Sequence, residues 1–222
     1  MSIPDRLAAV RARIAAGCRA VGRDPSEVGL IAVSKTQPLE AVESAATAPH
    51  MDFGESYAQE LRDKSRARPD LRWHFIGRVQ TNKAKYIAPV AHRIHALETV
   101  RQASALARRA SGPLACLMMV NIADEESKAG VPAAEALERA HTLSAVDGID
   151  LVGLMALPPR ATDPEATAPW FAALQELAAR GQEQGLALTE LSMGMSQDAH
   201  VAVRYGATWV RVGTAIFGDR RR

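Results

Sequence analysis

The sequence predicts a closed (β/α)8 barrel preceded by one extra helix. Apolar runs of strand length alternate with helical patterns eight times, at intervals of roughly 20 to 30 residues. The run 114–120 is apolar without a break, as in a strand covered on both faces of a parallel sheet. The 222 residues, 47% of them hydrophobic, are enough for a single domain over 1–222, and no linker interrupts them. An open doubly wound sheet is the structural alternative.

The extra helix is expected within residues 1–24. Its apolar residues recur at helical spacing: Ile3, Leu7, Val10, Ile14, Cys18 and Val21. Ser2 and Asp5 are placed as a capping pair at its start, and Gly22 is placed to end it. The chain therefore opens with an amphipathic helix before the alternation begins.

Each predicted strand is followed by a predicted helix. The strands are expected at 28–34, 51–54, 72–76, 93–97, 114–122, 150–157, 188–193 and 208–212. The helices are expected from 38, over 56–66, from 81, up to 110, over 132–146, over 164–184 and, capped by Ser196, over 196–206. In such a barrel the active face lies at the carboxyl ends of the strands.

Composition excludes several classes of partner. A net charge of +2, from 27 basic and 25 acidic residues, gives no reason to expect nucleic acid or a membrane. Two unpatterned cysteines suit a reducing compartment, and the N-terminus has no leader pattern, so we expect a cytoplasmic protein. We also expect a monomer, with a flexible tail at 219–222. The histidines show no zinc-binding spacing, so no structural metal is expected.

Lys35 stands out because it follows a probable buried strand, Leu30–Val33, with only Ser34 between them. A solvated lysine has a pKa near 10.4, so about one molecule in a thousand carries the neutral amine at pH 7. Desolvation lowers such a pKa by up to ~3 to 5 units, which is how proteins make Schiff-base lysines. The alternative is a strand-end lysine whose ammonium group reaches water.

Two loops are suited to hold a phosphate. Ser196 follows the seventh strand, and Gly213 and Thr214 follow the eighth, the positions where barrels most often bind this group. Backbone N–H groups at a helix start attract anions, and glycine allows a close approach of the main chain. The alternative is that Ser196 is only an N-cap and Gly213 only a turn residue.

Arg211 lies on the same strand face as Trp209 and Gly213. A guanidinium in a core strand needs a partner, either a carboxylate in a structural ion pair or a ligand heteroatom. A Schiff-base lysine, a phosphate cradle and an arginine in one barrel together indicate pyridoxal phosphate, which offers an aldehyde, a phosphate and a ring nitrogen. His74 is expected to pack in the core or at the rim, and the acidic run 124–126 to be solvated.

Several segments resemble the pyridoxal phosphate homeostasis proteins, the YggS-like family. They are Ala-Val-Ser-Lys-Thr at 32–36, Phe-Gly-Glu-Ser-Tyr at 53–57, Trp-His-Phe-Ile-Gly at 73–77, Gln-x-Asn-Lys at 80–83, Gly-Leu-Met-Ala-Leu at 153–157, Leu-Ser-Met-Gly-Met-Ser at 191–196 and Val-Arg-Val-Gly-Thr-Ala-Ile-Phe-Gly at 210–218. The match spans nearly the whole chain in order. It implies a barrel like the N-terminal domain of alanine racemase.

The resemblance also implies a role for particular residues. Pyridoxal phosphate is expected on Lys35, its phosphate at Ser196, Gly213 and Thr214, and its pyridine nitrogen near Arg211. Ser56 and Met155 complete the expected cofactor-binding set. The family commonly has asparagine where this chain has Ser56.

The family is thought to bind and buffer the cofactor and to influence vitamin B6 and amino-acid pools, with no established turnover. We therefore expect a carrier, with pyridoxal-phosphate-dependent apoenzymes as its recipients. The alternatives are an amino-acid racemase or lyase with the same cofactor, and a cofactor-free Schiff-base aldolase. A racemase needs a second acid or base over the ring. Tyr57 is the candidate for this second group that the sequence offers.

Overall fold

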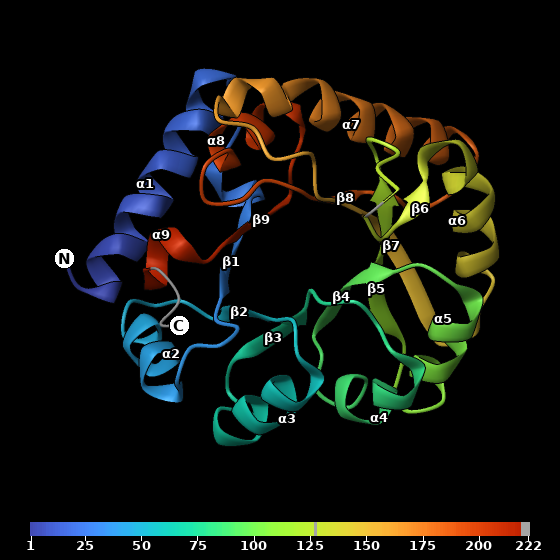
Figure 1. The fold of residues 1–222 in the computed structure, drawn as a ribbon, viewed down its shortest axis with the longest axis horizontal. Helices are drawn as coiled ribbons and strands as arrows, with labels where there is room; N and C mark the ends of the chain where they lie inside the picture. The colour runs from blue at the N-terminus through green and yellow to red at the C-terminus, as the bar shows by residue number, and fades with distance from the viewer. Residues whose placement is uncertain (127, 219–222) are drawn as a thin grey trace.

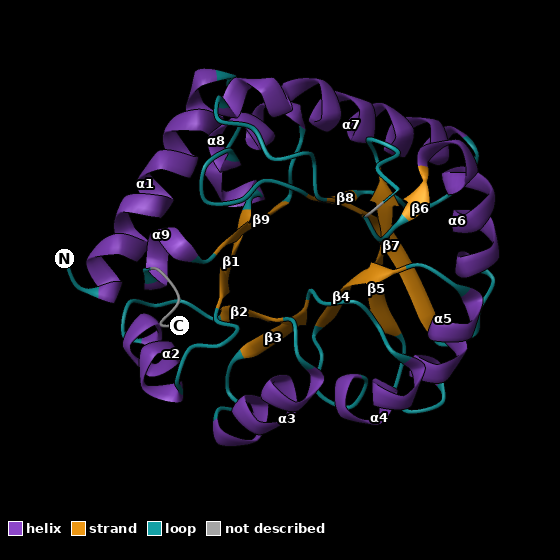
Figure 2. Cartoon of the chain, in the orientation of Figure 1, coloured by secondary structure: helices purple, strands orange, loops and turns teal. Residues whose placement is uncertain are grey.

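The protein forms a closed ring of parallel strands surrounded by helices (Figures 1 and 2). The computed structural model describes residues 1–126 and 128–218. The strands are β1 (Gly29–Val33), β2 (Asp52–Glu55), β3 (Arg72–Phe75), β4 (Arg93–Leu97), β5 (Leu114–Asn121), β6 (Val131–Pro132), β7 (Ile149–Ala156), β8 (Glu190–Ser192) and β9 (Trp209–Val212). Their order is β4-β3-β2-β1-β9-β8-β7-β5-β6, and β4 also pairs with β5. This last pairing closes the sheet, which confirms the barrel and rules out the open alternative.

The eight predicted strands are all present, with ends displaced by at most two residues. The short strand β6 was not predicted. It pairs with the end of β5, Val120 opposite Val131, and stands outside the ring. The predicted tail at 219–222 lies outside the described residues.

The helices cover the outside of the barrel. They are α1 (Ile3–Ala20), α2 (Leu39–Ala46), α3 (Ala58–Ala67), α4 (Ala84–Ile87), α5 (Val100–Ala107), α6 (Ala136–Ser144), α7 (Ala168–Glu183), α8 (Ala199–Ala202) and α9 (Thr214–Phe217). Helix α1 begins with the predicted capping box: the Asp5 N–H donates to Ser2 Oγ at 3.2 Å, and the Ser2 N–H donates to Asp5 Oδ2 at 2.9 Å. Its buried face packs against α2, α8 and α9 (Figure 1). None of the described helices is long and apolar enough to cross a membrane.

The prediction that Ser196 caps a helix is wrong. Helix α8 begins at Ala199, and Asp198 occupies its N-cap position. The Asp198 carboxylate accepts a hydrogen bond from the Met195 N–H at 2.6 Å, which holds 195–198 as a turn instead of a first helical turn. The Ser196 hydroxyl is therefore not engaged as a cap. The predicted end at Gly206 is confirmed, since this glycine has φ 82°.

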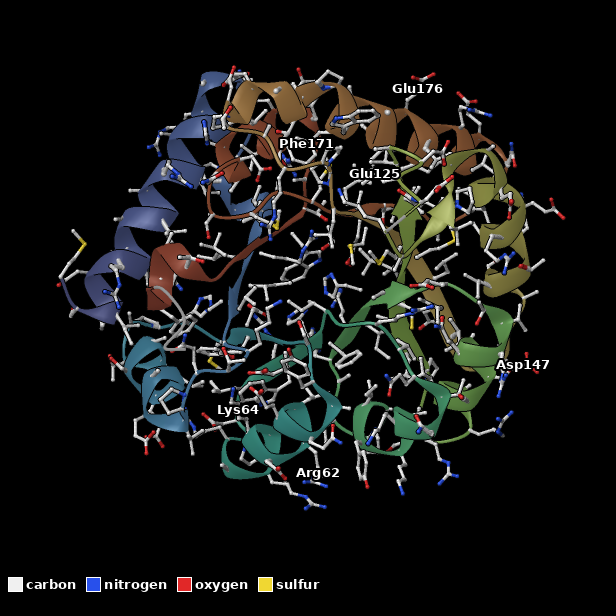
Figure 3. The ribbon with its side chains drawn as sticks, in the orientation of Figure 1. Arg62, Lys64, Glu125, Asp147, Phe171 and Glu176 are labelled. Carbon is white, nitrogen blue, oxygen red and sulfur yellow. The ribbon has the colours of Figure 1, made fainter. Side chains whose placement is uncertain are left out.

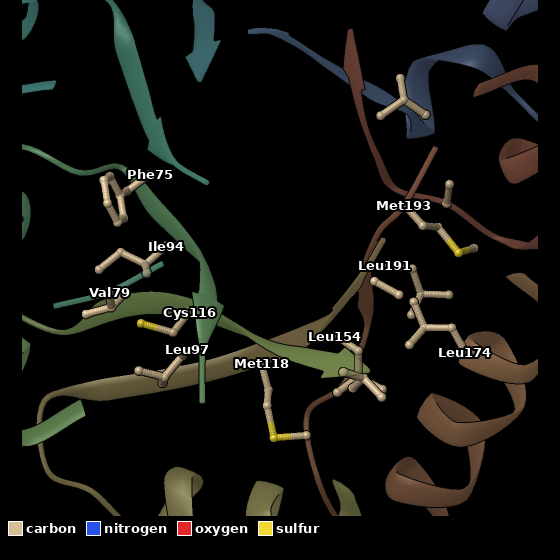
Figure 4. Packing of buried hydrophobic residues seen from close by; sticks show 14 of the residues in the cluster. Phe75, Val79, Ile94, Leu97, Cys116, Met118, Leu154, Leu174, Leu191 and Met193 are labelled. Carbon is tan, nitrogen blue, oxygen red and sulfur yellow. The ribbon is translucent and has the colours of Figure 1, made fainter. Parts of the chain in front are cut away.

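The apolar core is divided between two regions. The larger region lies between the strands and the helices. Figure 4 shows two parts of it: one contains Ile94, Leu97 and Cys116, and the other contains Leu154, Leu174 and Leu191. The smaller fills one side of the barrel interior with four residues of β4, β5 and β7: Ala96, Leu117, Met119 and Met155.

The remaining interior is polar and begins with a floor at the amino ends of the strands. Arg93 forms an ion pair with Glu190, and the Trp209 indole N–H donates to the same carboxylate at 2.8 Å. Each of these residues is the first of its strand. Gly29 makes room for the indole, because a Cβ at this position would lie 2.3 Å from the Trp209 ring. Paired charges and a large aromatic ring thus close the bottom of the barrel.

Candidate functional site

The predicted site residues lie toward the carboxyl end of the barrel, on both sides of β1. Lys35 is in the turn that follows β1, and Ser56 is in the bend that follows β2. Both are half-buried. Because β1 and β2 are neighbours in the sheet, these two residues leave adjacent strands at the same rim.

A cavity of about 690 Å³ lies beyond β8 and β9. Ser196, Thr214 and Ala215 line it together with residues of the loop after β7 such as Arg160. The Ala215 N–H donates to Ser196 Oγ at 3.4 Å, so the two predicted phosphate loops lie next to each other. The structure thus brings Ser196 and Thr214 to one cavity.

Gly213 connects this cavity to the end of β1. It is the N-cap residue of α9, and a Cβ there would lie 3.3 Å from the Val33 carbonyl oxygen. That distance is tight for any larger residue, so glycine lets β9 pass close to the strand that leads to Lys35. Gly213 can therefore serve as a turn residue and still offer its backbone N–H to a ligand.

Arg211 is buried inside the barrel, with 4% of its surface exposed. Its guanidinium donates to Ser192 Oγ at 2.5 Å and to the Ala156 carbonyl at 2.9 Å. Ala156 and Ser192 are the last residues of β7 and β8, which places the guanidinium toward the carboxyl end. Burial lowers the pKa of Arg211 to about 10, so it stays cationic at neutral pH.

The sequence predicted that Arg211 pairs either with a carboxylate or with a ligand heteroatom. Among the described residues, no carboxylate forms an ion pair with Arg211. A guanidinium has five N–H donors, and the two hydrogen bonds above leave others to meet a ligand. Met155 lies beside this group, because it pairs with Ser192 in the sheet and is 1% exposed.

A buried charged network braces the turn that carries Lys35. Lys64 of α3 (Figure 3) donates to Glu55 Oε1 at 2.7 Å, to Glu60 Oε2 at 2.9 Å and to the Ser34 carbonyl at 2.8 Å. The Ser34 hydroxyl donates to the same Glu55 oxygen at 2.7 Å. The residue just before Lys35 is therefore held through both its carbonyl and its hydroxyl.

Thr36, the residue just after Lys35, has a strained backbone. Its φ is 63°, a conformation that is a true outlier for a β-branched residue, and its N–H donates to Glu60 Oε2 at 2.8 Å. Such strain costs of the order of 1 to 3 kcal/mol and clusters at functional sites. The Lys64 network thus fixes both neighbours of Lys35.

Glu55 is the most deeply buried member of this network, with no exposed surface. Burial raises the pKa of Glu55 to about 7, against the opposing effect of the Lys64 ammonium. Its second oxygen, Oε2, is buried without a hydrogen-bond partner among the described residues. The carboxyl group is therefore poised between two protonation states directly beneath the turn that holds Lys35.

Sequence reasoning did not find this network. In the sequence, Glu55 stands out only as part of the Phe-Gly-Glu-Ser-Tyr segment at 53–57, and nothing singles out Lys64. The available signal was the four-residue spacing of Glu60 and Lys64 on one helix face, but this pattern usually marks a solvated surface pair. His74 was expected in the core or at the rim, and it is fully buried.

Comparison with known proteins places this geometry in a family. Residues 6–221 match the family model described as alanine racemase, N-terminal domain. Proteins named pyridoxal phosphate homeostasis protein match at 41% identity in Pseudomonas aeruginosa, over 99% of this chain and 96% of the relative, and at 38% in Escherichia coli K12, over 98% and 97%.

Solved structures agree with these matches. A protein from Bifidobacterium adolescentis superposes with a TM-score of 0.90 at 31% identity, over 97% of this chain and 94% of the other. PipY of Synechococcus elongatus PCC7942, solved with PLP bound, superposes with a TM-score of 0.84 at 35% identity, over 97% and 100%. The alanine racemase of Corynebacterium glutamicum, at 17% identity and a TM-score of 0.71, shares the fold.

The fold and the rim residues thus define a barrel of the alanine racemase N-terminal domain class. Within that class the chain belongs to the family of the pyridoxal phosphate homeostasis proteins, as its full-length relatives show.

Replacing Lys64 tests the bracing network. In Lys64→Met the buried Glu55 carboxylate loses its cation, so we expect a loss of about 3 to 5 kcal/mol in the free energy of unfolding, measured by urea denaturation above pH 7, and a smaller loss at lower pH, where Glu55 is protonated. The matched control is Lys128→Met, since Lys128 pairs with Glu125 and both are partly exposed. That pair should contribute at most about 1 kcal/mol. Equal losses in the two variants would show that Lys64 does not brace the site.

Proposed function

We propose that this protein binds pyridoxal 5'-phosphate covalently through Lys35 and acts in the homeostasis of vitamin B6 and amino acids. The observation that supports the proposal is that three kinds of group lie toward the carboxyl end of the barrel. These are the amine of Lys35, the hydroxyls of Ser196 and Thr214, and the guanidinium of Arg211. The names of the relatives and the PLP-bound PipY structure support it.

The residues fit the cofactor by size and chemistry. The cavity of about 690 Å³ is within the usual range for small-molecule sites; Ser196 and Thr214 line it, while Lys35 and Arg211 are not among its lining residues. Ser196, Gly213 and Thr214 offer hydroxyl and backbone N–H donors suited to a phosphate, and Arg211 offers donors suited to a ring nitrogen. Ser56 and Met155 are proposed to contact the ring. When bound, the cofactor supplies an electrophilic aldehyde and an electron-withdrawing ring.

A carrier role agrees with the surroundings of Lys35 better than catalysis does. Arg211 is cationic and acts as a donor, so a ring nitrogen beside it stays unprotonated and the ring is a weak electron sink. Tyr57, the candidate second base, is 54% exposed at the start of α3. We infer a monomer in the cytoplasm that passes the cofactor to pyridoxal-phosphate-dependent apoenzymes.

Attachment to Lys35 is tested by colour and by chemical trapping. The purified protein should be yellow with pyridoxal phosphate, and borohydride should fix the cofactor to the peptide that contains Lys35. Lys35→Ala should be colourless. Mapping of the reduced cofactor to Lys83 or Lys128 would show that the proposed attachment is wrong. A colourless wild-type protein that still binds sugar phosphates would favour the aldolase alternative.

The phosphate role of Ser196 is tested by comparing two ligands. Loss of one hydrogen bond to a charged group costs about 1.5 to 3 kcal/mol, so Ser196→Ala should bind pyridoxal phosphate about ten- to a hundredfold more weakly. Binding of pyridoxal, which has no phosphate, should change little. Titration calorimetry gives both constants. Equal affinity of wild type and variant for pyridoxal phosphate would remove this role.

Slow turnover is the third expectation. A missing acid or base typically lowers a rate by about 10² to 10⁴, and a weak electron sink lowers it further. Holo-protein incubated with single enantiomers of alanine, serine, lysine or glutamate should therefore show racemisation near background by chiral chromatography. A turnover number of about 1 s⁻¹ or more that Lys35→Ala abolishes would favour the racemase alternative.

A further inference from the structure

A continuous chain of buried side chains runs through the barrel from its floor to Arg211. Asp52 Oδ1 lies 3.0 Å from His74 Nε2, and His74 Nδ1 lies 3.0 Å from His95 Nε2. His95 Nδ1 then lies 2.8 Å from Ser192 Oγ, which accepts the 2.5 Å hydrogen bond from Arg211. The five residues come from β2, β3, β4, β8 and β9, and each is buried.

The direction of every hydrogen bond in this chain follows from its two ends. Arg211 only donates, so the single hydrogen of the Ser192 hydroxyl is left for His95 Nδ1. His95 must then carry its hydrogen on Nε2 and donate to His74 Nδ1. His74 in turn carries its hydrogen on Nε2 and donates to Asp52, which as a carboxylate only accepts.

The chain is complete only if both imidazoles are neutral. Burial lowers the pKa of His74 and lowers that of His95 well below its ordinary value, which leaves one hydrogen on each ring. Among the described residues, no side-chain atom of this chain is buried without a partner. Asp52 also accepts two hydrogen bonds from Arg72, at 2.8 and 2.6 Å, and Arg72 is half exposed at the floor.

The chain does not conduct protons at neutral pH. Net transfer from Arg211 to Asp52 would move a proton from a group with a pKa of about 10 to one with a pKa of about 2. It would also place charge on two buried rings. Arg211 is a fixed cation and Asp52 a fixed anion, and neutral side chains join them. The two charges therefore polarise every hydrogen bond of the chain in the same direction.

We propose that Asp52, His74, His95 and Ser192 are positioning residues that orient Arg211 as a permanent hydrogen-bond donor, with Asp52 as its remote counter-charge. This inference rests on the proposed function in one respect, namely that Arg211 meets the ring nitrogen of pyridoxal phosphate. The network then keeps that nitrogen unprotonated. It gives the polar half of the barrel interior a role in holding the cofactor unreactive.

The tautomers are measurable without any cofactor. Long-range ¹⁵N–¹H correlation of the ¹⁵N-histidine-labelled apoprotein at pH 7, assigned with a His95→Gln variant, should show His74 and His95 neutral with the hydrogen on Nε2. A hydrogen on Nδ1 of either ring, or an imidazolium, would overturn the proposal. This outcome does not depend on whether pyridoxal phosphate binds.

A second arm measures the effect on the ligand. Pyridoxal phosphate labelled with ¹⁵N at the ring nitrogen is bound to wild type, to Ser192→Ala and to Asp52→Asn. Both variants should shift the ring resonance and weaken binding several-fold. Asp52 lies on the floor of the barrel, far along the chain from Arg211. A change in the ring-nitrogen resonance in Asp52→Asn must therefore be transmitted through the hydrogen-bonded side chains. The control Ser65→Ala removes a buried hydroxyl of α3 that donates to the Arg62 carbonyl, and it should change neither quantity.

The results separate the two proposals. A wild-type protein that does not bind pyridoxal phosphate refutes the proposed function, while the tautomers still test the directed chain. Folded Ser192→Ala and Asp52→Asn proteins with wild-type ring resonance and affinity would show that the chain is only structural, which overturns the positioning role. If Ser192→Ala does not fold, Asp52→Asn, which keeps the shape of the side chain, decides.

Discussion

The pairing of β4 with β5 is the constraint on which the rest of the structure depends, because it turns a parallel sheet into a ring. In a closed ring, alternate side chains of every strand must point into a small interior that has no access to bulk water. Polar groups placed there have only one another as partners. The directed chain from Asp52 to Arg211 and the charged floor are the consequence of closing the ring over these residues.

The fold was predictable because it follows from patterns between residues that are close in the sequence. Apolar runs such as Leu114–Val120 and the capping pair Ser2 and Asp5 act within a few residues of each other, so spacing alone reveals them. Ser196 was misplaced for the opposite reason. The turn that delays α8 depends on the Asp198 carboxylate competing for the Met195 N–H, and several neighbouring side chains offer such caps with similar energies.

The site was predictable only in part, because strand ends are visible in the sequence and contacts across the barrel are not. The location of Lys35, Arg211 and Gly213 at the carboxyl end of the barrel could be predicted from their positions after or within strands. The contact between His95 and Ser192 joins residues separated by 97 positions, and no periodicity connects them. Lys64 was hidden because a lysine on a helix that also carries Asp63 and Arg66 reads as surface, and only the tertiary packing buries it.

The closed floor also governs how such a barrel exchanges its contents. Arg93, Glu190 and Trp209 fill the amino end with paired charge and a packed ring, and the buried chain of side chains from Asp52 to Arg211 lies above them. Whatever enters the rim must leave by the same opening. Under the proposed carrier role, loading of the cofactor and its release to a recipient would use the same face of the barrel.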